Sequence, residues 1–226
     1  MRKLLHCASG ALFVLAPKPA LAQLGVLDVR TLCVPPEIHQ GGPQEKPCLN
    51  ELRQVAKRDG GVLTLKLDNG KTKVISDSKE CDDPTRESLC VKRRLVGYVG
   101  DQQFMLVVAP YECPLVLLVN RRTGEETMLA GWPNLSPNKK RFVVTSSSVL
   151  GNCNPPYAVA VFSLTSAVPR LEWKYAPPAD DNDYEYDGWD GDSRVLLRVL
   201  AIGKGATSAR LTLTAQGWQL TRANGR

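Results

Sequence analysis

The side chains best suited to chemistry gather in one acidic segment near the end of the chain. It reads Asp180-Asp181-Asn182-Asp183-Tyr184-Glu185-Tyr186-Asp187-Gly188-Trp189-Asp190-Gly191-Asp192. The stretch from Asp183 to Gly188 follows the opening of a calcium-binding loop, with Glu185 at the second ligand position. Hard cations bind several oxygens at about 2.3–2.6 Å, and carboxylates at alternate positions around a glycine turn supply such oxygens. The pattern predicts a calcium site at Asp183, Glu185, Asp187, Asp190 and Asp192.

The second half of the segment departs from that calcium pattern. The ninth position holds Gly191 rather than an acid, and the twelfth holds Arg194 where a bidentate glutamate is expected. The alternative is a solvated acidic turn that joins two β units and packs Tyr184, Tyr186 and Trp189 only in part. We favour this alternative, and a calcium-dependent, lectin-like protein stays as the second interpretation. No other cofactor is indicated.

Catalytic groups other than carboxylates are scarce. The chain has two histidines, and His39 lies in a stretch rich in Pro, Gly and Gln that reads as a surface loop. No nucleophile elbow, phosphate-binding loop, zinc-binding H-E-x-x-H or dinucleotide-binding glycine motif is present. Paired carboxylates are set by three-dimensional spacing, so a carboxylate-based hydrolase stays as the lesser alternative. The sequence favours a protein that is not an enzyme.

The first 22 residues have the three parts of a secretory signal peptide. Arg2 and Lys3 make the basic start, an apolar stretch runs over residues 4–16, and Ala20-Leu21-Ala22 matches the small-residue cleavage site. The apolar stretch is shorter than the roughly 20 residues that span a bilayer, and no later segment reaches that length. We expect cleavage near Ala22 and a periplasmic or secreted protein.

Cleavage would leave an even number of cysteines and little net charge. Cys7 leaves with the signal, and Cys33, Cys48, Cys81, Cys90, Cys113 and Cys153 remain, as in a fully disulfide-bonded exported protein. Without the three basic residues before position 23, 26 Lys and Arg stand against 23 Asp and Glu, a net charge of +3 rather than +6. Nucleic-acid binding therefore loses its support.

Hairpin patterns dominate the chain after residue 60. Residues 62–67 and 72–75 alternate around Asn69-Gly70, the strongest short hairpin signal. Three similar pairs follow, and three of the four hairpins come after a polar turn and a further apolar strand. The later pairs are residues 115–120 with 126–129, 157–164 with 170–175, and 209–214 with 218–220; the preceding strands are residues 104–109, 141–146 and 194–202. The unit recurs every 40–50 residues or so, within the range of β-propeller blades.

One copy of this unit carries a recognisable motif. Residues 135–146 read Leu-Ser-Pro-Asn-Lys-Lys-Arg-Phe-Val-Val-Thr-Ser. This stretch resembles the opening strand of TolB-type and WD40-like β-propeller repeats, with Lys139 where those repeats usually carry glycine. Residues 115–124 resemble the second strand and Thr-Gly turn, so the resemblance covers about residues 95–178. It implies an all-β, small propeller-like fold of antiparallel meanders. A β-sandwich is the alternative, and ring closure stays open.

The resemblance also implies a disulfide pairing. Cys113 and Cys153 lie in equivalent loops of consecutive units, which neighbouring blades would bring together, so Cys113–Cys153 is the implied inter-blade bridge. Cys81–Cys90 would then close a local loop, and Cys33–Cys48 would hold the N-terminal arm. Each bridge would stabilise the fold by about 2–4 kcal/mol.

Three regions follow along the chain. Residues 1–22 are the signal peptide, residues 23–60 an irregular arm with a short helix over residues 47–60, and residues 61–226 the β-repeat domain. In that helix Asn50 is the candidate cap and Gly60 the stop.

Short basic clusters stand at turns and strand starts: Lys92-Arg93-Arg94, Arg121-Arg122 and Lys139-Lys140-Arg141. They would either form a face for anionic surfaces or, as we favour, protect strand edges from pairing. The sequence thus predicts an exported, non-catalytic binding protein whose partner is another protein or a component of the cell envelope.

Overall fold

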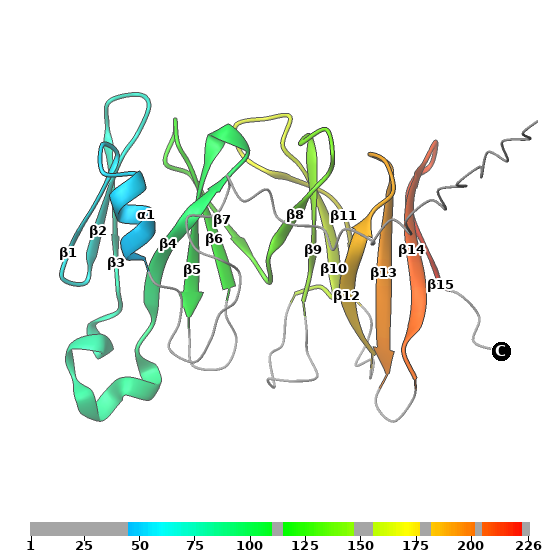
Figure 1. Ribbon diagram of the computed structural model, residues 1–226. Helices are drawn as coiled ribbons and strands as arrows, with labels where there is room; N and C mark the ends of the chain where they lie inside the picture. Colours follow the sequence, from blue (N-terminus) through cyan, green and yellow to red (C-terminus); the bar gives the residue numbers. More distant parts are fainter. Residues whose placement is uncertain (1–44, 110–114, 147–155, 177–181, 202–204, 223–226) are drawn as a thin grey trace, which may run out of the picture.

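The chain folds into antiparallel β-sheets connected by short loops and helices. The structure, a computed structural model, describes residues 45–109, 115–146, 156–176, 182–201 and 205–222 (Figure 1). Within these residues, fifteen strands form four sheets, and the strands of each sheet lie side by side in chain order. Each sheet is therefore a simple meander, which confirms the predicted all-β fold of repeated antiparallel meanders.

Each sheet takes its strands from one continuous stretch of chain. The first sheet has three strands: β1 (Ala56–Asp59), β2 (Val62–Lys66) and β3 (Thr72–Ser76). The second has β4 (Lys92–Val99), β5 (Gln103–Ala109), β6 (Leu115–Asn120) and β7 (Glu126–Leu129). The third has β8 (Pro133–Leu135), β9 (Arg141–Thr145), β10 (Val159–Ser163) and β11 (Arg170–Tyr175). The fourth has β12 (Asn182–Trp189), β13 (Arg194–Ala201), β14 (Thr207–Thr214) and β15 (Gly217–Arg222).

The helices are short. α1 (Lys46–Glu51) precedes the first sheet, the 3-10 helices η1 (Lys79–Asp82) and η2 (Pro84–Leu89) lie between β3 and β4, and η3 (Gly100–Gln102) joins β4 to β5. In the described part of the chain, no helix has the length and apolar character needed to cross a membrane.

The helix predicted over residues 47–60 is only half right. α1 ends at Glu51, and Asn50 lies inside it rather than at its cap. Residues 56–59 form β1, because they pair with β2 from Ala56 opposite Leu65 to Asp59 opposite Val62. A helix this short depends on tertiary packing, and here the sheet supplies a better partner for the second half of the segment.

All four hairpins were predicted, but the first strand of each sheet was not. β4 begins with three basic residues, β8 is three residues long and begins with proline, and β12 carries the acidic residues. These three strands were not recognised in the sequence because of their charged residues and proline. In β12 the alternation of Asp183, Glu185 and Asp187 with two tyrosines is itself the period of a strand, so the expectation of an acidic loop was wrong there.

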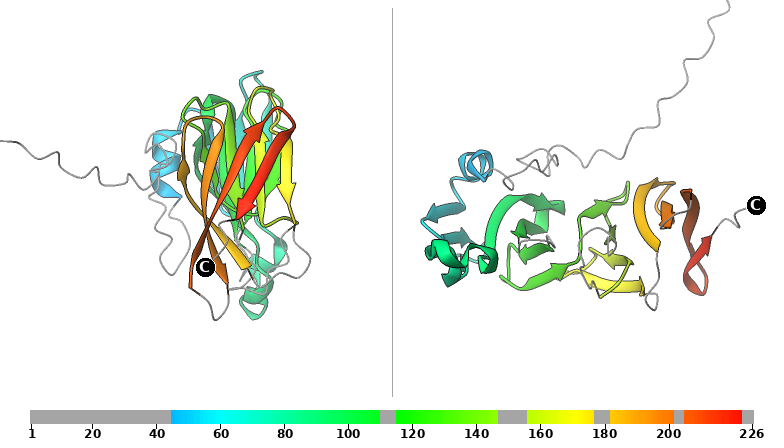
Figure 2. Two further views of the ribbon diagram at one scale, coloured as in Figure 1. Left: turned by 90° about the vertical axis from the view of Figure 1, so that its right-hand side faces the viewer. Right: turned by 90° about the horizontal axis from the view of Figure 1, so that it is seen from below.

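The four sheets stand in a row, face to face. The first and last sheets lie at opposite ends of the row in both Figure 1 and the right-hand view of Figure 2. Each of three separate apolar clusters joins one pair of neighbouring sheets. The described sheets form an open row rather than a closed ring, and they are four separate layers rather than the two layers of a sandwich.

A strand's position in the row explains its composition. In the second sheet, Phe104 and Leu106 of β5 pack toward the first sheet, whereas Met105 and Val107 pack toward the third. Middle sheets are therefore buried on both faces, and their inner strands, such as β6 and β10, are nearly continuous apolar runs. The end sheets bury one face only, so β2 buries Leu63 and Leu65 between more exposed neighbours.

Hydrogen bonds between turns tie neighbouring sheets together at one end of the strands. The backbone N–H of Asp68, between β2 and β3, donates to the carbonyl of Arg121, between β6 and β7 (2.7 Å). The side chain of Gln103 donates to the carbonyl of Ala167 (2.6 Å), which joins the second sheet to the third. The N–H of Asn138 donates to the Asp192 carboxylate (2.8 Å), which joins the third sheet to the fourth.

Two turn residues show how tight these junctions are. Gly131, between β7 and β8, lies so close to β9 that a Cβ atom there would overlap the carbonyl oxygen of Thr145. Lys139 has a φ of 58°, the left-handed conformation that favours glycine. The position at which propeller repeats usually carry glycine thus has the backbone conformation of a glycine.

An ion pair replaces a partner strand at the outer edge of β4. The Glu45 carboxylate accepts the backbone N–H of Leu95 (2.7 Å), and the Arg58 guanidinium donates to the carbonyl of Arg93. Arg58 also pairs with Glu45 (2.8 Å). An exposed edge strand invites pairing with another chain, and this pair satisfies two of the exposed groups.

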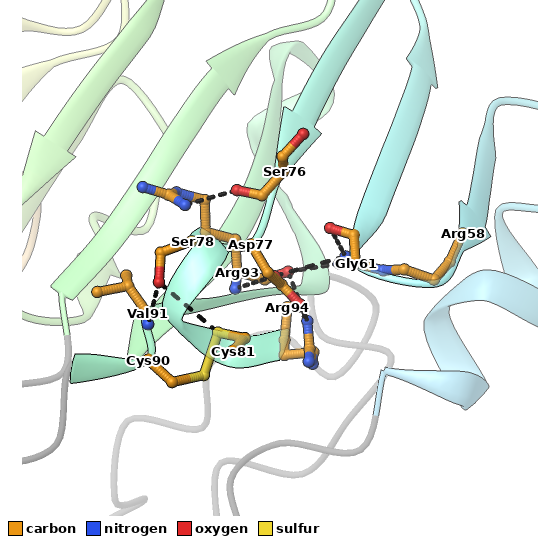
Figure 3. The surroundings of a disulfide bond; sticks show 10 residues. All are labelled: Arg58, Gly61, Ser76, Asp77, Ser78, Cys81, Cys90, Val91, Arg93 and Arg94. Carbon is orange, nitrogen blue, oxygen red and sulfur yellow. Dashed lines mark hydrogen bonds and ion pairs between the residues drawn. A yellow bond between two sulfur atoms is a disulfide. The ribbon is translucent and has the colours of Figure 1, made fainter. Parts of the chain in front are cut away.

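A disulfide shapes the connection from the first sheet to the second. Cys81 and Cys90 are bonded, with Cα atoms 4.5 Å apart, as the sequence predicted (Figure 3). Beside them the Ser78 hydroxyl accepts the N–H of Val91 (2.9 Å). The Asp77 carboxylate accepts the N–H of Arg93 (2.8 Å) and pairs with Arg94 (2.7 Å), so it completes the charged network along β4.

We expect Glu45→Ala to lower the free energy of unfolding by about 3 kcal/mol, since it leaves Arg58 buried without its main partner. Glu45 makes no side-chain cap to α1, so no cap is lost. Glu185→Ala is the matched control, because Glu185 also pairs with an arginine, Arg198, but is 44% exposed where Glu45 is 8% exposed. The control should cost less than about 1 kcal/mol. Urea denaturation measures both, and equal losses would contradict a structural role for the buried pair.

Candidate binding site on the outer face of the last sheet

The acidic segment of the sequence forms β12 and the turn that follows it. Tyr184 and Tyr186 pack in the apolar cluster between the third and fourth sheets. Trp189, expected in a loop, is the last residue of the strand, and its indole N–H donates to the carbonyl of Asn134 on β8 (3.0 Å). β12 is therefore anchored to the third sheet by its aromatic side chains.

The structure does not gather the five predicted calcium ligands. Glu185 pairs with Arg198, Asp190 pairs with Arg194, and Asp192 accepts a backbone N–H from the third sheet. Asp183 is buried, and Asp187 lies in the β-bulge and takes part in neither ion pair. Among the residues that the structure describes, no three His, Cys, Asp or Glu side chains form a group that could hold a metal ion.

Outside the acidic segment, two buried carboxylates have structural roles. Glu45 and the side chain of Asp77 are both shielded from solvent and lie near one another through Arg58, at 2.8 and 3.6 Å. Each is also hydrogen-bonded to backbone N–H groups of β4. Acids held by guanidinium and backbone in this way fit the edge of a sheet better than the paired acids of a hydrolase.

Some of the cysteines predicted to form disulfides lie in the described residues, and the others lie outside them. Cys81–Cys90 is present, and Cys48 is disulfide-bonded and fully buried against the first sheet. Cys33, Cys113, Cys153 and His39 lie outside the described residues, so the Cys33–Cys48 and Cys113–Cys153 pairings stay predictions.

The basic clusters act mostly within the fold. Arg93 and Arg94 contact the Ser76 carbonyl and Asp77 beside the disulfide. Arg121 pairs with Asp68 and stacks over Phe104, its guanidinium carbon 5.5 Å from the ring centre. Arg141 pairs with Glu172. These contacts support the favoured view that the basic residues serve turns and edges.

A hollow of about 430 Å³ opens on the outer face of the fourth sheet. β13 and β14 alternate there, with Val195, Leu197 and Leu211 packed inward. The outward side chains of the two central strands and of β15 line the hollow, together with Asp187 of β12. The residues that carry its chemistry are Asp187, Leu196, Ser208, Arg210, Thr212 and Thr221.

The lining has three charged residues, Asp187, Arg210 and Arg222, and the first two are placed without an ion pair among the described residues. Glu185 and Asp190 each pair with an arginine across β12 and β13, but Asp187 lies between them in a β-bulge, where the register shifts between Tyr186 and Gly188. Leu196 pairs with Gly188 on one side and with Arg210 on the other. No ion pair joins Asp187 or Arg210 to another described residue.

An aromatic layer supports the sheet from beneath. Trp189 and Trp218 meet edge to face at 6.2 Å, and Tyr175 meets Tyr184 in the same way at 5.7 Å. Arg222 lies over Tyr175 and Tyr184, 5.7 and 5.5 Å from the two ring centres, and donates to the Tyr175 hydroxyl. Such contacts hold the outer face on a rigid base.

Arg210, Thr212 and Thr221 were missed in the sequence. Their signal is the polar alternation of β14, which reads exposed, exposed, buried, exposed, buried from Thr207 to Leu211. Alternation identifies a half-solvated strand, but it does not show that the sheet stands at the end of a row.

Fold and site together define a class: an all-β protein of stacked antiparallel meanders with a polar hollow on one terminal sheet. Neither a scan against protein-family models nor a search of the curated proteins found a match for this chain. Its function must therefore be argued from the site itself.

The aromatic layer predicts a loss of stability at alkaline pH. Burial raises the pKa of Tyr184 from 10.0 to about 12, although Arg222 acts in the opposite direction. The folded state favours the neutral phenol, so this stabilisation is complete below pH 10 and disappears as the pH rises through 12. Urea denaturation between pH 9 and 12 should show that Tyr184→Phe flattens the decline. Burial also raises the pKa of Tyr157 and Tyr186, so part of the decline should remain. An identical decline in both proteins would contradict this role of Tyr184.

Proposed function

We propose that this protein is an exported, non-catalytic binding protein that acts outside the cytoplasm through the outer face of the β12–β15 sheet. The observation that carries the proposal is the hollow in which Asp187 and Arg210 stand without an ion-pair partner among the described residues. Elsewhere on the same face, acids and arginines neutralise one another. Binding sites combine apolar contact with a few such polar groups that fix orientation.

Export is supported by sequence and structure in different ways. The N-terminal 22 residues have the basic, apolar and small-residue parts of a signal peptide. Cys81–Cys90 is bonded and Cys48 is in a disulfide, which suits an oxidising compartment. The partner would be another protein or a component of the cell envelope.

Export predicts a defined mature N-terminus. When the full chain is expressed in a secreting host, N-terminal sequencing of the protein outside the cytoplasm should begin at Gln23. Thiol labelling of the unfolded mature chain should find no free cysteine, because all six would be bonded. A protein that keeps Met1, or one that retains free thiols after export, would contradict the proposal.

Binding through the last sheet predicts a variant with a selective defect. The wild-type mature chain should retain a binding partner from the envelope and extracytoplasmic fraction of the source cell. We expect Arg210→Gln not to retain that partner. Lys66→Gln is the matched control, since it removes the same charge from an exposed position on the outward face of β2, at the other end of the row.

The measurement compares the retained material by mass spectrometry, after the three proteins show equal melting temperatures. Retention by the wild type and Lys66→Gln, but not by Arg210→Gln, supports the proposal. Equal retention by all three, or no retention by the wild type, would contradict it.

A further inference from the structure

We propose that the hollow on the β12–β15 sheet binds a neutral carbohydrate chain. This inference rests on the proposed function and narrows its ligand to one chemical class. It follows from the charges, the apolar floor and the hydroxyl groups of the hollow, taken in turn.

The separated charges fit a ligand that both donates and accepts hydrogen bonds. The Asp187 carboxylate only accepts, and the Arg210 guanidinium only donates. They reach the hollow from different strands with Leu196 between their strand positions. Sugar hydroxyls do both, so one saccharide unit can donate to Asp187 and accept from Arg210.

The lining between the charges suits the two kinds of surface on a sugar ring. Leu196 presents an apolar surface to the C–H face of a ring. Ser208, Thr212 and Thr221 present hydroxyls that can act as donor or acceptor with ring substituents. The hollow lies on the face of the sheet, which suits part of a chain rather than a fully enclosed small molecule.

The placing of Asp187 in the lining disfavours polyanions, and the position of the hollow disfavours strands of protein. Asp187 would repel phosphate or a dense run of carboxylates, and Arg222 of the same lining is already held over two tyrosine rings. A peptide added as a strand would pair with a free edge, whereas this hollow lies on the face of the sheet, over its central strands. A neutral polyhydroxylated chain is not repelled by Asp187 and does not need a free strand edge.

Titration calorimetry of the oxidised mature chain with four purified tetrasaccharides tests this inference. Chitotetraose, cellotetraose and maltotetraose are neutral, and tetragalacturonate is acidic. We expect at least one neutral probe to bind with a Kd of about 1 mM or tighter. Arg210→Gln and Asp187→Asn should each weaken that binding by about tenfold or more, since each leaves ligand hydroxyls unpaired. Lys66→Gln should bind as the wild type does.

Binding should also be the same with and without EDTA, because the groups named here act without a metal ion. Failure of every neutral probe to bind, binding of the acidic probe alone, loss of binding in EDTA, or unchanged binding by both site variants would overturn the inference. If the Arg210-dependent retention described above still holds in those cases, the proposed function stands and only the carbohydrate class fails. If that retention is also lost, both fail.

Discussion

Each of the four sheets carries apolar side chains on at least one face, and the sheets cover one another by stacking face to face, with α1 adding Cys48 to the cover of the first sheet. Three clusters of buried residues fill the three spaces between neighbouring sheets. In the described part of the chain the row does not close, so no other sheet covers the outer face of either end sheet. The inner strands of the middle sheets, such as β6 and β10, are therefore almost wholly apolar, whereas β2 and β14 of the end sheets alternate between buried and more exposed residues.

Each sheet also has free edges, which must be protected from pairing with another chain. Charged side chains protect β4, because Glu45 and Arg58 take the hydrogen-bonding positions of a neighbouring strand. β8 is protected because it is short, starts with proline and receives the indole N–H of Trp189. Charged and aromatic residues that resemble a functional cluster in the sequence thus serve the architecture in the second and third sheets.

Charged and aromatic residues can serve either the architecture or a functional site, and for that reason only part of the structure could be predicted from the sequence. The hairpins were predictable because a turn such as Asn69-Gly70 and the alternation beside it are local features. Cys81–Cys90 was predictable because its loop is short. β4, β8 and β12 were not, since Arg93, Pro133 and Asp183 look unsuited to strands until their neighbours in space are known. The hollow was not predictable either, because it needs β12, β13, β14 and β15 placed side by side.

The site depends on one irregularity in β12. Glu185 faces Arg198 of β13 and pairs with it, Asp183 faces Leu200, and an unshifted register would place Asp187 opposite Leu196. The bulge at Asp187 takes one acid out of that series and leaves Leu196 opposite Gly188. Bulges re-aim side chains in this way beside functional sites. Arg210 on β14 faces Leu196 on one side and Thr221 on the other, so no acid lies opposite it, and a carboxylate and a guanidinium both line the hollow. The proposed binding therefore rests on one extra residue in a strand, which takes Asp187 out of the paired register of β12.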